Sequence, residues 1–507
     1  MCSSKGRAVT RRCFAKGCAA GLAFCASGSL AGEARRQKVR VALVFLSRRG
    51  SSWPSPVFDV AKREGEVLAL LRKGCPEVEF VPVAVRSPGD ARKALDLKDK
   101  VDGYLIYTLT LTWGLRGALM AIAGAGKPVV VADEILGGSG LFLTGYSALC
   151  RRRVAAVGVS SSRDEDLVAV ARCFSALGEP GMTPAAFAQR CQEVYRKTFP
   201  KVGELKCLDD RVELTDIGKC VERFKRSRFL IVGRGRAGQR ARFLGAEGVF
   251  VGFEELKALY DKVDPDKAAA RAERWTKEAE RVIDARPEWI RKSAAVYLAL
   301  LELLKRYETD TVTINCLGGF AAGKLPAYPC LAFMQLLNDG GHGVCEAMPD
   351  DTLSMLMGRI LSGRAGFVSD PALDTSRNRI IYAHCVGTTK VFGPKGSANP
   401  FRIMTLHSRD PRSTAVRSLF PEGYMTTSFR TNYRRRLMVI HRAKAVGNLN
   451  ADRGCRTQLV GEVRGDIAKL FHQWDLFGWH RVTFYGDLAE PLAEFGKALG
   501  LRVVEEA

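Results

Sequence analysis

Three residues in the last third of the sequence have side chains that suit a divalent cation. Glu346 ends a short apolar run, Asp370 ends a second one 24 residues later, and His480 directly precedes a run of strand-forming residues. Two carboxylates and an imidazole fit a hard-to-borderline cation such as Mn²⁺ or Mg²⁺ and leave coordination positions for substrate oxygens. All six histidines of the chain also lie in this third, so the sequence predicts that the chemistry is located there.

Each of these residues alone has a simpler structural explanation. A carboxylate such as Glu346 stabilises a helix N-terminus, Asp370 suits the start of a turn, and His480 can pack in a core. Asp350 or Asp351 is expected to cap the helix that follows Glu346. The residue types therefore suit a metal site only when the three are taken together.

Several segments around these residues share one pattern. They are Cys316–Cys330, Leu331–Leu337, Cys345–Glu346, Phe367–Asp370, Ile381–Cys385 and His480–Val504. Here the chain resembles the L-fucose isomerase family of sugar isomerases, most closely over residues 310–507. The resemblance implies that Glu346, Asp370 and His480 hold a divalent metal, usually Mn²⁺, and that the protein is a homo-oligomer (a trimer or hexamer). Trp479 stands where the family usually has a smaller polar residue, which leaves the identity of the sugar open.

The three residues suit the interconversion of an aldose and a ketose. This reaction moves a proton between C1 and C2 through an enediol, and a cation bound to O1 and O2 stabilises the negative charge that develops. Two carboxylates beside the cation can remove and return protons. We therefore expect Glu346 and Asp370 to be catalytic groups as well as ligands, His480 to be a ligand only, and the substrate to be a monosaccharide. His384 is a candidate for lining the pocket, with no role assigned.

A glycine-rich loop supports a different function. Gly233 to Gly238 follow a predicted strand and match G-x-G-x-x-G, a loop that lets the backbone approach a pyrophosphate, and Glu254 could bind the ribose. This pattern predicts, as an alternative, a NAD(P)-binding oxidoreductase. Such glycine patterns are also common in ordinary turns, and residues 239–242 form a poor apolar helix face. A third alternative is a non-catalytic exported sugar-binding protein with the same fold.

Strand-like and helix-like segments alternate over the first two thirds of the sequence. Apolar runs such as 39–46 and 228–232 are typical of strands buried in a parallel sheet, and a long helix is predicted over Trp275–Arg306. From about residue 362, short strand-like runs separated by Gly, Pro, Asn and Asp indicate antiparallel structure. The predicted fold class is α/β, with two doubly wound parallel-sheet domains followed by a mostly antiparallel β C-terminal domain. The predicted domains are 35–178, 179–361 with Glu346, and 362–507 with Asp370 and His480.

Residues 1–34 have the pattern of an export signal. A basic segment that contains Arg11 and Arg12 is followed by an uncharged stretch rich in Gly, Ala and Ser, as in a twin-arginine signal peptide. That stretch is too short and too weakly apolar to span a bilayer, and no later segment is long and apolar enough. We therefore predict export to the periplasm or another extracytoplasmic compartment and no membrane span.

The net charge of +24 raises the question of a nucleic-acid partner. Part of this charge lies in residues 219–242, without a nucleic-acid-binding motif or interleaved aromatic residues. We expect a solvated basic face, or loose attraction to an anionic surface or polysaccharide, and no nucleic acid. The chain has 15 cysteines and no C-x-x-C pair, so most of them are expected to be small buried apolar residues.

Overall fold

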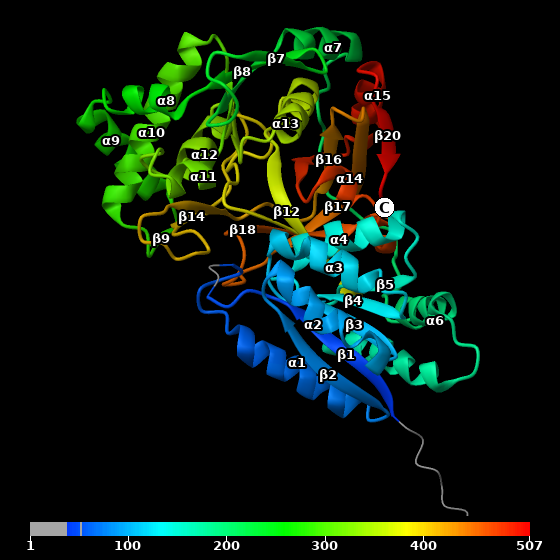
Figure 1. Ribbon diagram of the computed structural model, residues 1–507. Helices are drawn as coiled ribbons and strands as arrows, with labels where there is room; N and C mark the ends of the chain where they lie inside the picture. The colour runs from blue at the N-terminus through cyan, green and yellow to red at the C-terminus, as the bar shows by residue number, and fades with distance from the viewer. Residues whose placement is uncertain (1–37, 51–52) are drawn as a thin grey trace, which may run out of the picture. The chain divides into compact units, whose positions relative to one another are not determined.

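The computed structural model describes residues 38–50 and 53–507. The strands in this part form two α/β sheets, a closed antiparallel sheet and a small three-stranded sheet (Figure 1). The predicted export signal over residues 1–34 lies outside the described residues. Within the described part, no helix is both long enough and apolar enough to cross a membrane.

The first sheet has five parallel strands in the order β2-β1-β3-β4-β5. They are β1 (Val39–Leu46), β2 (Val78–Val85), β3 (Gly103–Thr108), β4 (Val129–Asp133) and β5 (Ala156–Val159). Consecutive residues of β1 enter different cores, since Val41 packs on one face of the sheet and Ala42 on the other. From Val41 to Leu46 the strand is apolar and buried because helices cover both faces, which makes this sheet doubly wound.

Six helices cover the first sheet. One face carries α1 (Val60–Gly74), α5 (Asp164–Arg172) and α6 (Pro184–Arg196), and the other carries α2 (Ala91–Leu95), α3 (Arg116–Ala123) and α4 (Ser139–Arg151). Helix α1 begins after Asp59, whose side chain accepts a hydrogen bond from the backbone N–H of Lys62. Phe187 of α6 packs into the same core as α1, so the packing around this sheet extends beyond residue 178.

The second sheet is parallel except for one edge strand. Its order is β11-β10-β6-β8-β7. The strands are β6 (Arg228–Val232), β7 (Arg240–Phe243), β8 (Ala246–Val251), β10 (Thr311–Ile314) and β11 (His342–Cys345). Strand β7 pairs with β8 in the antiparallel direction, and the other neighbours are parallel.

Seven helices belong to the segment that contains the second sheet. They are α7 (Ile217–Arg226), α8 (Phe253–Tyr260), α9 (Pro265–Glu278), α10 (Pro287–Arg306), α11 (Cys316–Ala321), α12 (Cys330–Asn338) and α13 (Pro349–Ser362). The single long helix predicted over Trp275–Arg306 is wrong. Trp275 belongs to α9, a short strand β9 (Arg281–Ile283) follows, and Pro287 starts α10. Proline is favoured at that first position because its missing N–H would have no partner inside the helix.

The Gly233–Gly238 loop joins two strands. Gly233, Gly235 and Gly238 have φ angles of 77°, 67° and 81°, which favour glycine, and the chain continues directly into β7. A dinucleotide-binding loop of this pattern opens a helix whose N-terminus meets the pyrophosphate. This loop therefore lacks the helix that the dinucleotide interpretation needs.

The C-terminal strands form a closed antiparallel sheet. Its strands are β12 (Phe367–Asp374), β13 (Arg379–His384), β16 (Met425–Asn432), β17 (Leu437–Asn448), β18 (Thr457–Val463) and β19 (Arg481–Tyr485). They pair in the order β16-β19-β12-β13-β18-β17, and β17 pairs again with β16, which closes the barrel and leaves these strands no free edge. The predicted change from parallel α/β structure to antiparallel β structure is thus confirmed.

The remaining elements surround this barrel. They are the strands β14 (Phe401–Met404) and β15 (Ala415–Ser418), which form the small sheet with β9, the helices α14 (Trp474–Phe477) and α15 (Ala489–Ala498), and β20 (Arg502–Glu505). Strand β20 pairs with β17 in the parallel direction. The chain thus ends in a strand, a helix and a strand: β19, α15 and β20.

Candidate metal centre

Glu346 lies in a backbone conformation that is uncommon for residues with a side chain. It directly follows β11 and has a φ of 67°, and the next residue, Ala347, has a φ of 50°. Left-handed conformations cost a residue other than glycine about 1–3 kcal/mol and persist where the surrounding structure enforces them, often at functional sites. The turn directs the Glu346 carboxylate into a cavity, and the side chain remains 31% exposed.

Asp370 and His480 become neighbours through strand pairing. In the antiparallel pair of β12 and β19, Ser369 is opposite Arg481, so the next position on each strand brings Asp370 beside His480. Asp370 Oδ1 lies 3.2 Å from His480 Nε2, and both side chains are buried. The apolar run before Asp370 suggests that this residue lies at the edge of an element, but Asp370 lies inside β12, which continues through Pro371 to Asp374.

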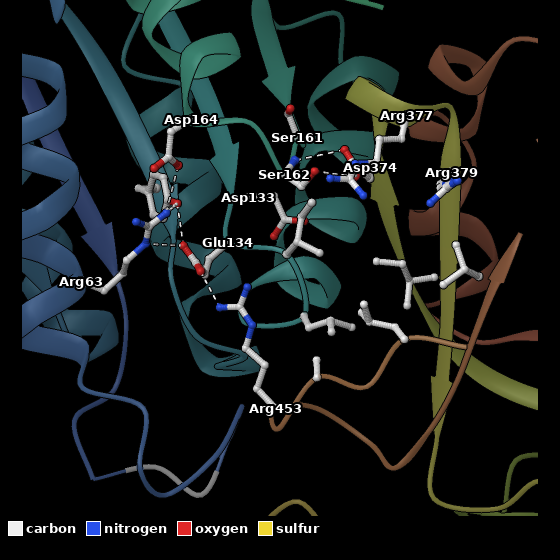
Figure 2. Close-up of a pocket in the computed structure, with 17 residues that line it drawn as sticks. Arg63, Asp133, Glu134, Ser161, Ser162, Asp164, Asp374, Arg377, Arg379 and Arg453 are labelled. Carbon is white, nitrogen blue, oxygen red and sulfur yellow. Dashed lines mark hydrogen bonds and ion pairs between the residues drawn. The ribbon is translucent and has the colours of Figure 1, made fainter. Parts of the chain in front are cut away.

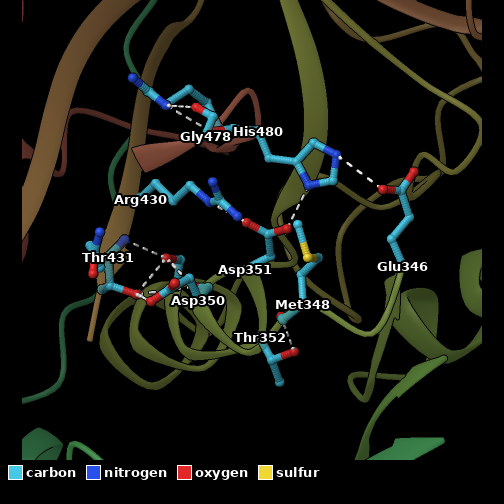
Figure 3. A network of polar contacts seen from close by, with 12 residues as sticks. Glu346, Met348, Asp350, Asp351, Thr352, Arg430, Thr431, Gly478 and His480 are labelled. Atoms are coloured by element: carbon cyan, nitrogen blue, oxygen red, sulfur yellow. Dashed lines mark hydrogen bonds and ion pairs between the residues drawn. The ribbon is translucent and has the colours of Figure 1, made fainter. Parts of the chain in front are cut away.

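A second carboxylate fixes the orientation of the His480 ring. Asp351 Oδ2 lies 2.6 Å from His480 Nδ1, and Asp351 Oδ1 accepts a 2.5 Å hydrogen bond from Arg430 Nε (Figure 3). With Nδ1 held in this way, Nε2 faces Asp370 and also Glu346, whose Oε2 is 3.7 Å away. A carboxylate behind a histidine is the usual support of a metal-ligating imidazole.

The expected capping role of Asp350 or Asp351 is wrong. Helix α13 starts at Pro349 without a side-chain cap. Asp350 Oδ1 instead accepts a hydrogen bond from the backbone N–H of Tyr433, while Asp351 reaches His480. The sequence does contain a signal for this second role. Two acids stand side by side at the start of one helix, and a cap needs only one of them.

The buried charges set the protonation of His480 and Asp351. Burial alone would lower the pKa of His480, but the carboxylates of Asp351 and Asp370 outweigh it and raise this pKa well above the usual range. Burial would raise the pKa of Asp351, but the charges of Arg430 and His480 lower it to about 2. The carboxylates thus concentrate negative charge around Nε2, where a divalent cation would replace the proton.

His384 is brought to the same place from the end of β13. Ligand atoms of Glu346, His384 and His480 all lie within 4.8 Å of one another. The two imidazole rings meet edge to face with centroids 5.5 Å apart, and His384 Nδ1 is buried without a hydrogen-bond partner in the described part of the chain. An unsatisfied buried nitrogen is costly, so a ligand at this position would stabilise it.

These groups line a cavity of about 500 Å³. This size lies in the range of small-molecule sites, about 300–1,000 Å³. Part of its wall is aromatic, since Trp479 lies 6.0 Å from Trp53 and 5.9 Å from Trp113 between ring centroids. A Cβ atom on Gly140 of α4 would approach the Trp479 ring to 2.6 Å, so glycine makes room for the indole. The cavity also has five cysteines in its lining: Cys316, Cys330, Cys345, Cys385 and Cys455.

A second cavity of about 370 Å³ has a charged lining (Figure 2). Its central acid is Glu134, which binds Arg63 at 2.9 Å and Arg453 at 2.6 Å, so these charges compensate one another. Asp133 Oδ2 accepts hydrogen bonds from two serine hydroxyls, whereas its buried Oδ1 has no partner within residues 38–50 and 53–507. Burial raises the pKa of Asp133 to about 7. This cavity offers no imidazole and no group of metal ligands among the described residues.

Comparisons with known proteins add little to this geometry. No family model and no curated protein matches the sequence. Among solved structures, the chain is similar to a diflavin flavoprotein A3 from Nostoc sp., with 13% sequence identity and a TM-score of 0.19, over 32% of this chain and 99% of the other. A likeness of this extent carries no argument about fold or function.

Proposed function

We propose that the protein is a divalent-metal-dependent aldose–ketose isomerase that acts on a monosaccharide through an enediol, similar to the L-fucose isomerase family. The observation that carries the proposal is the convergence of the Glu346 and Asp370 carboxylates on Nε2 of His480, at 3.7 Å and 3.2 Å. The three residues come from different elements, and the cavity that they line is large enough for a small molecule.

The donor set fits Mn²⁺ or Mg²⁺. Glu346, Asp370 and His480 would hold the cation through two oxygens and one nitrogen, a set that suits a hard-to-borderline ion. His384 is close enough to be a further ligand. One of its ring nitrogens lies within 4.8 Å of ligand atoms of Glu346 and His480, and its buried Nδ1 has no hydrogen-bond partner in the described part of the chain. When bound, the cation supplies Lewis-acid stabilisation of negative charge on the O1 and O2 oxygens of the sugar.

The carboxylates move the protons of the reaction. One carboxylate removes the proton from C2 of the aldose while O1 gains a proton, which gives the enediol. The O2 hydroxyl then loses its proton and C1 receives one, which gives the ketose, so the proton count balances. We assign these transfers to Glu346 and Asp370, because both carboxylates line the cavity, whereas Asp351 is fully buried behind His480.

The test is an aldose panel assayed for ketose formation after removal of bound metal and addition of Mn²⁺. We expect at least one aldose to be converted, with activity that disappears in chelator and falls by about 100-fold or more in Glu346→Gln. If the protein binds Mn²⁺ and a sugar but converts no aldose, the non-catalytic sugar-binding alternative replaces this proposal. Binding of NADPH at submillimolar concentration would instead support an oxidoreductase that uses Gly233–Gly238.

Three further expectations rest on the sequence and are proposed with this function. They are a homo-oligomer, a trimer or hexamer; export through the twin-arginine pattern of residues 1–34; and an organisation into domains over 35–178, 179–361 and 362–507. Light scattering of the purified protein tests the first, and cell fractionation of the full chain tests the second. Limited proteolysis tests the third through cleavage near residues 178 and 361.

A further inference from the structure

Five cysteines converge on the cavity that holds the carboxylates. The structure describes eleven cysteines, none of them in a disulfide, and five line this one cavity. Their positions in the sequence run from 316 to 455, and they lie on different elements or loops. A cysteine can line such a cavity as a small apolar residue, so a ligand role needs closely spaced donor atoms as well.

Cys385, His407 and Cys455 form a group of their own. One ligand atom from each lies within 4.8 Å of the other two, and the Sγ atoms of Cys385 and Cys455 are 3.3 Å apart. In a tetrahedral zinc site, Zn–S distances of about 2.3 Å place two sulfur ligands about 3.8 Å apart. The sulfur pair is therefore about 0.5 Å closer than two zinc-bound sulfurs, a difference that small side-chain rotations remove.

The histidine supplies independent support. Its Nδ1 atom is buried and has no hydrogen-bond partner anywhere in the described ranges. The ring packs edge-on against Trp53, with centroids 4.7 Å apart, which holds it beside the two thiols. A disulfide between Cys385 and Cys455 would explain the sulfur contact but would leave this nitrogen of His407 unsatisfied, whereas a metal ion can use all three side chains.

We propose that Cys385, His407 and Cys455 bind a thiophilic cation of the Zn²⁺ type. Two thiolates and one imidazole favour a softer ion such as Zn²⁺, whereas the carboxylate-rich group around His480 favours a harder ion such as Mn²⁺ or Mg²⁺. The two groups would therefore bind different cations. With three protein ligands, one coordination position is left for water or a ligand, as in catalytic zinc sites. All three residues line the cavity, which is where that fourth position can be filled.

The end of β13 connects the two groups. His384 belongs to the group with Glu346 and His480, and the next residue, Cys385, belongs to the thiolate group. Cys455 approaches because β13 pairs with β18, with His384 opposite Thr457. The cavity would thus contain two cation sites of different chemistry, and this inference does not depend on the isomerase reaction.

Co²⁺ binding to the reduced, metal-free full-length protein tests the proposal, because only thiolate ligands give cobalt intense charge-transfer absorption in the near ultraviolet. We expect one equivalent of Co²⁺ to produce this absorption in the wild-type protein and in Glu346→Gln, and Zn²⁺ to displace it. The absorption should be lost in Cys385→Ser and in Cys455→Ser. It should persist in Cys330→Ser, a matched control in the same cavity outside the group.

Three results would overturn the proposal. They are absence of the absorption in reduced wild-type protein, an absorption that survives both Cys385→Ser and Cys455→Ser, and a Cys385–Cys455 disulfide in the protein as isolated.

A second measurement needs no variant, in case the serine variants fail to fold. Stoichiometric Zn²⁺ should protect Cys385 and Cys455, and not Cys330, from alkylation, as read by peptide mass spectrometry, and equal labelling with and without Zn²⁺ would also contradict the site.

Discussion

His480 Nδ1 and Asp351 Oδ2 lie 2.6 Å apart, and this contact decides which nitrogen of the histidine faces the cavity. Asp351 is fully buried and is itself held by Arg430, so the ring cannot turn without breaking a buried hydrogen bond. The orientation leaves Nε2 directed at Asp370 and Glu346. Asp351 is thus a positioning residue for the candidate metal centre.

Asp351→Asn should weaken Mn²⁺ binding roughly 10- to 100-fold, the usual effect of removing the partner behind a metal-ligating histidine. Isothermal titration with Mn²⁺ measures the effect. Asp350→Asn is the matched control, because Asp350 precedes it on α13 but bonds the backbone of Tyr433 and not His480. Equal Mn²⁺ affinity in Asp351→Asn and the wild-type protein, with both folded by circular dichroism, would contradict the positioning role.

Strands that are buried on both faces are the elements that the sequence predicts best. The apolar run over residues 39–46 coincides with β1, because successive side chains from Val41 to Leu46 pack alternately into two cores and are all buried. The helix predicted over Trp275–Arg306 is wrong because two helices with similar apolar periodicity flank β9. The periodicity of apolar residues cannot reveal β9, because this strand has only three residues and its pairing partner, β14, is distant in the sequence.

The candidate site depends on strand register, which residue spacing does not encode. The types of Glu346, Asp370 and His480 and a family resemblance predicted them as ligands, and the structure places both carboxylates near His480 Nε2. The group of mutually close ligand atoms contains Glu346, His480 and His384, which had no assigned role. The two thiols of Cys385 and Cys455 could not be paired from the sequence, because only the alignment of β13 with β18 makes them neighbours. A search for closely spaced cysteine motifs finds local ligand pairs and misses this kind of site.

Glu346→Gln and Asp370→Asn should each lower kcat for the converted aldose by about 10²- to 10⁴-fold, the usual contribution of a positioned acid or base. Removing a carboxylate should also weaken Mn²⁺ binding, so kcat is measured at saturating Mn²⁺. Glu494→Gln, an exposed acid on α15, is the control. An Asp370→Asn enzyme that keeps more than about half of the wild-type kcat would exclude Asp370 from the proton transfers.

Asp133→Asn should flatten the pH dependence of stability between about pH 4 and pH 7. Burial raises the pKa of Asp133 from 3.8 to about 7, so the folded state binds a proton that the unfolded state has released over this range. Stability from this group is therefore present below about pH 4 and is lost as the pH rises to about 7. Urea unfolding at several pH values measures the slope. Asp99→Asn, an exposed aspartate, should leave the slope unchanged, and an unchanged slope in Asp133→Asn would contradict the assignment.

Glu506→Gln should destabilise the protein by about 3–5 kcal/mol, because it leaves the buried Arg481 without its carboxylate. Burial alone would raise the pKa of Glu506, but the charge of Arg481 and hydrogen bonds from Arg481 and His441 lower it to about 2. The folded pKa lies below the ordinary value of 4.5, so this stability is present above pH 4.5 and is lost as the pH falls to about 2. Urea unfolding at pH 7 and pH 3 measures both effects. Glu505→Gln is the control, because it removes only a solvent-exposed ion pair with Arg442 and should lower the free energy of unfolding by less than about 1 kcal/mol. Equal losses of stability in the two variants would show that burial of Glu506 contributes nothing.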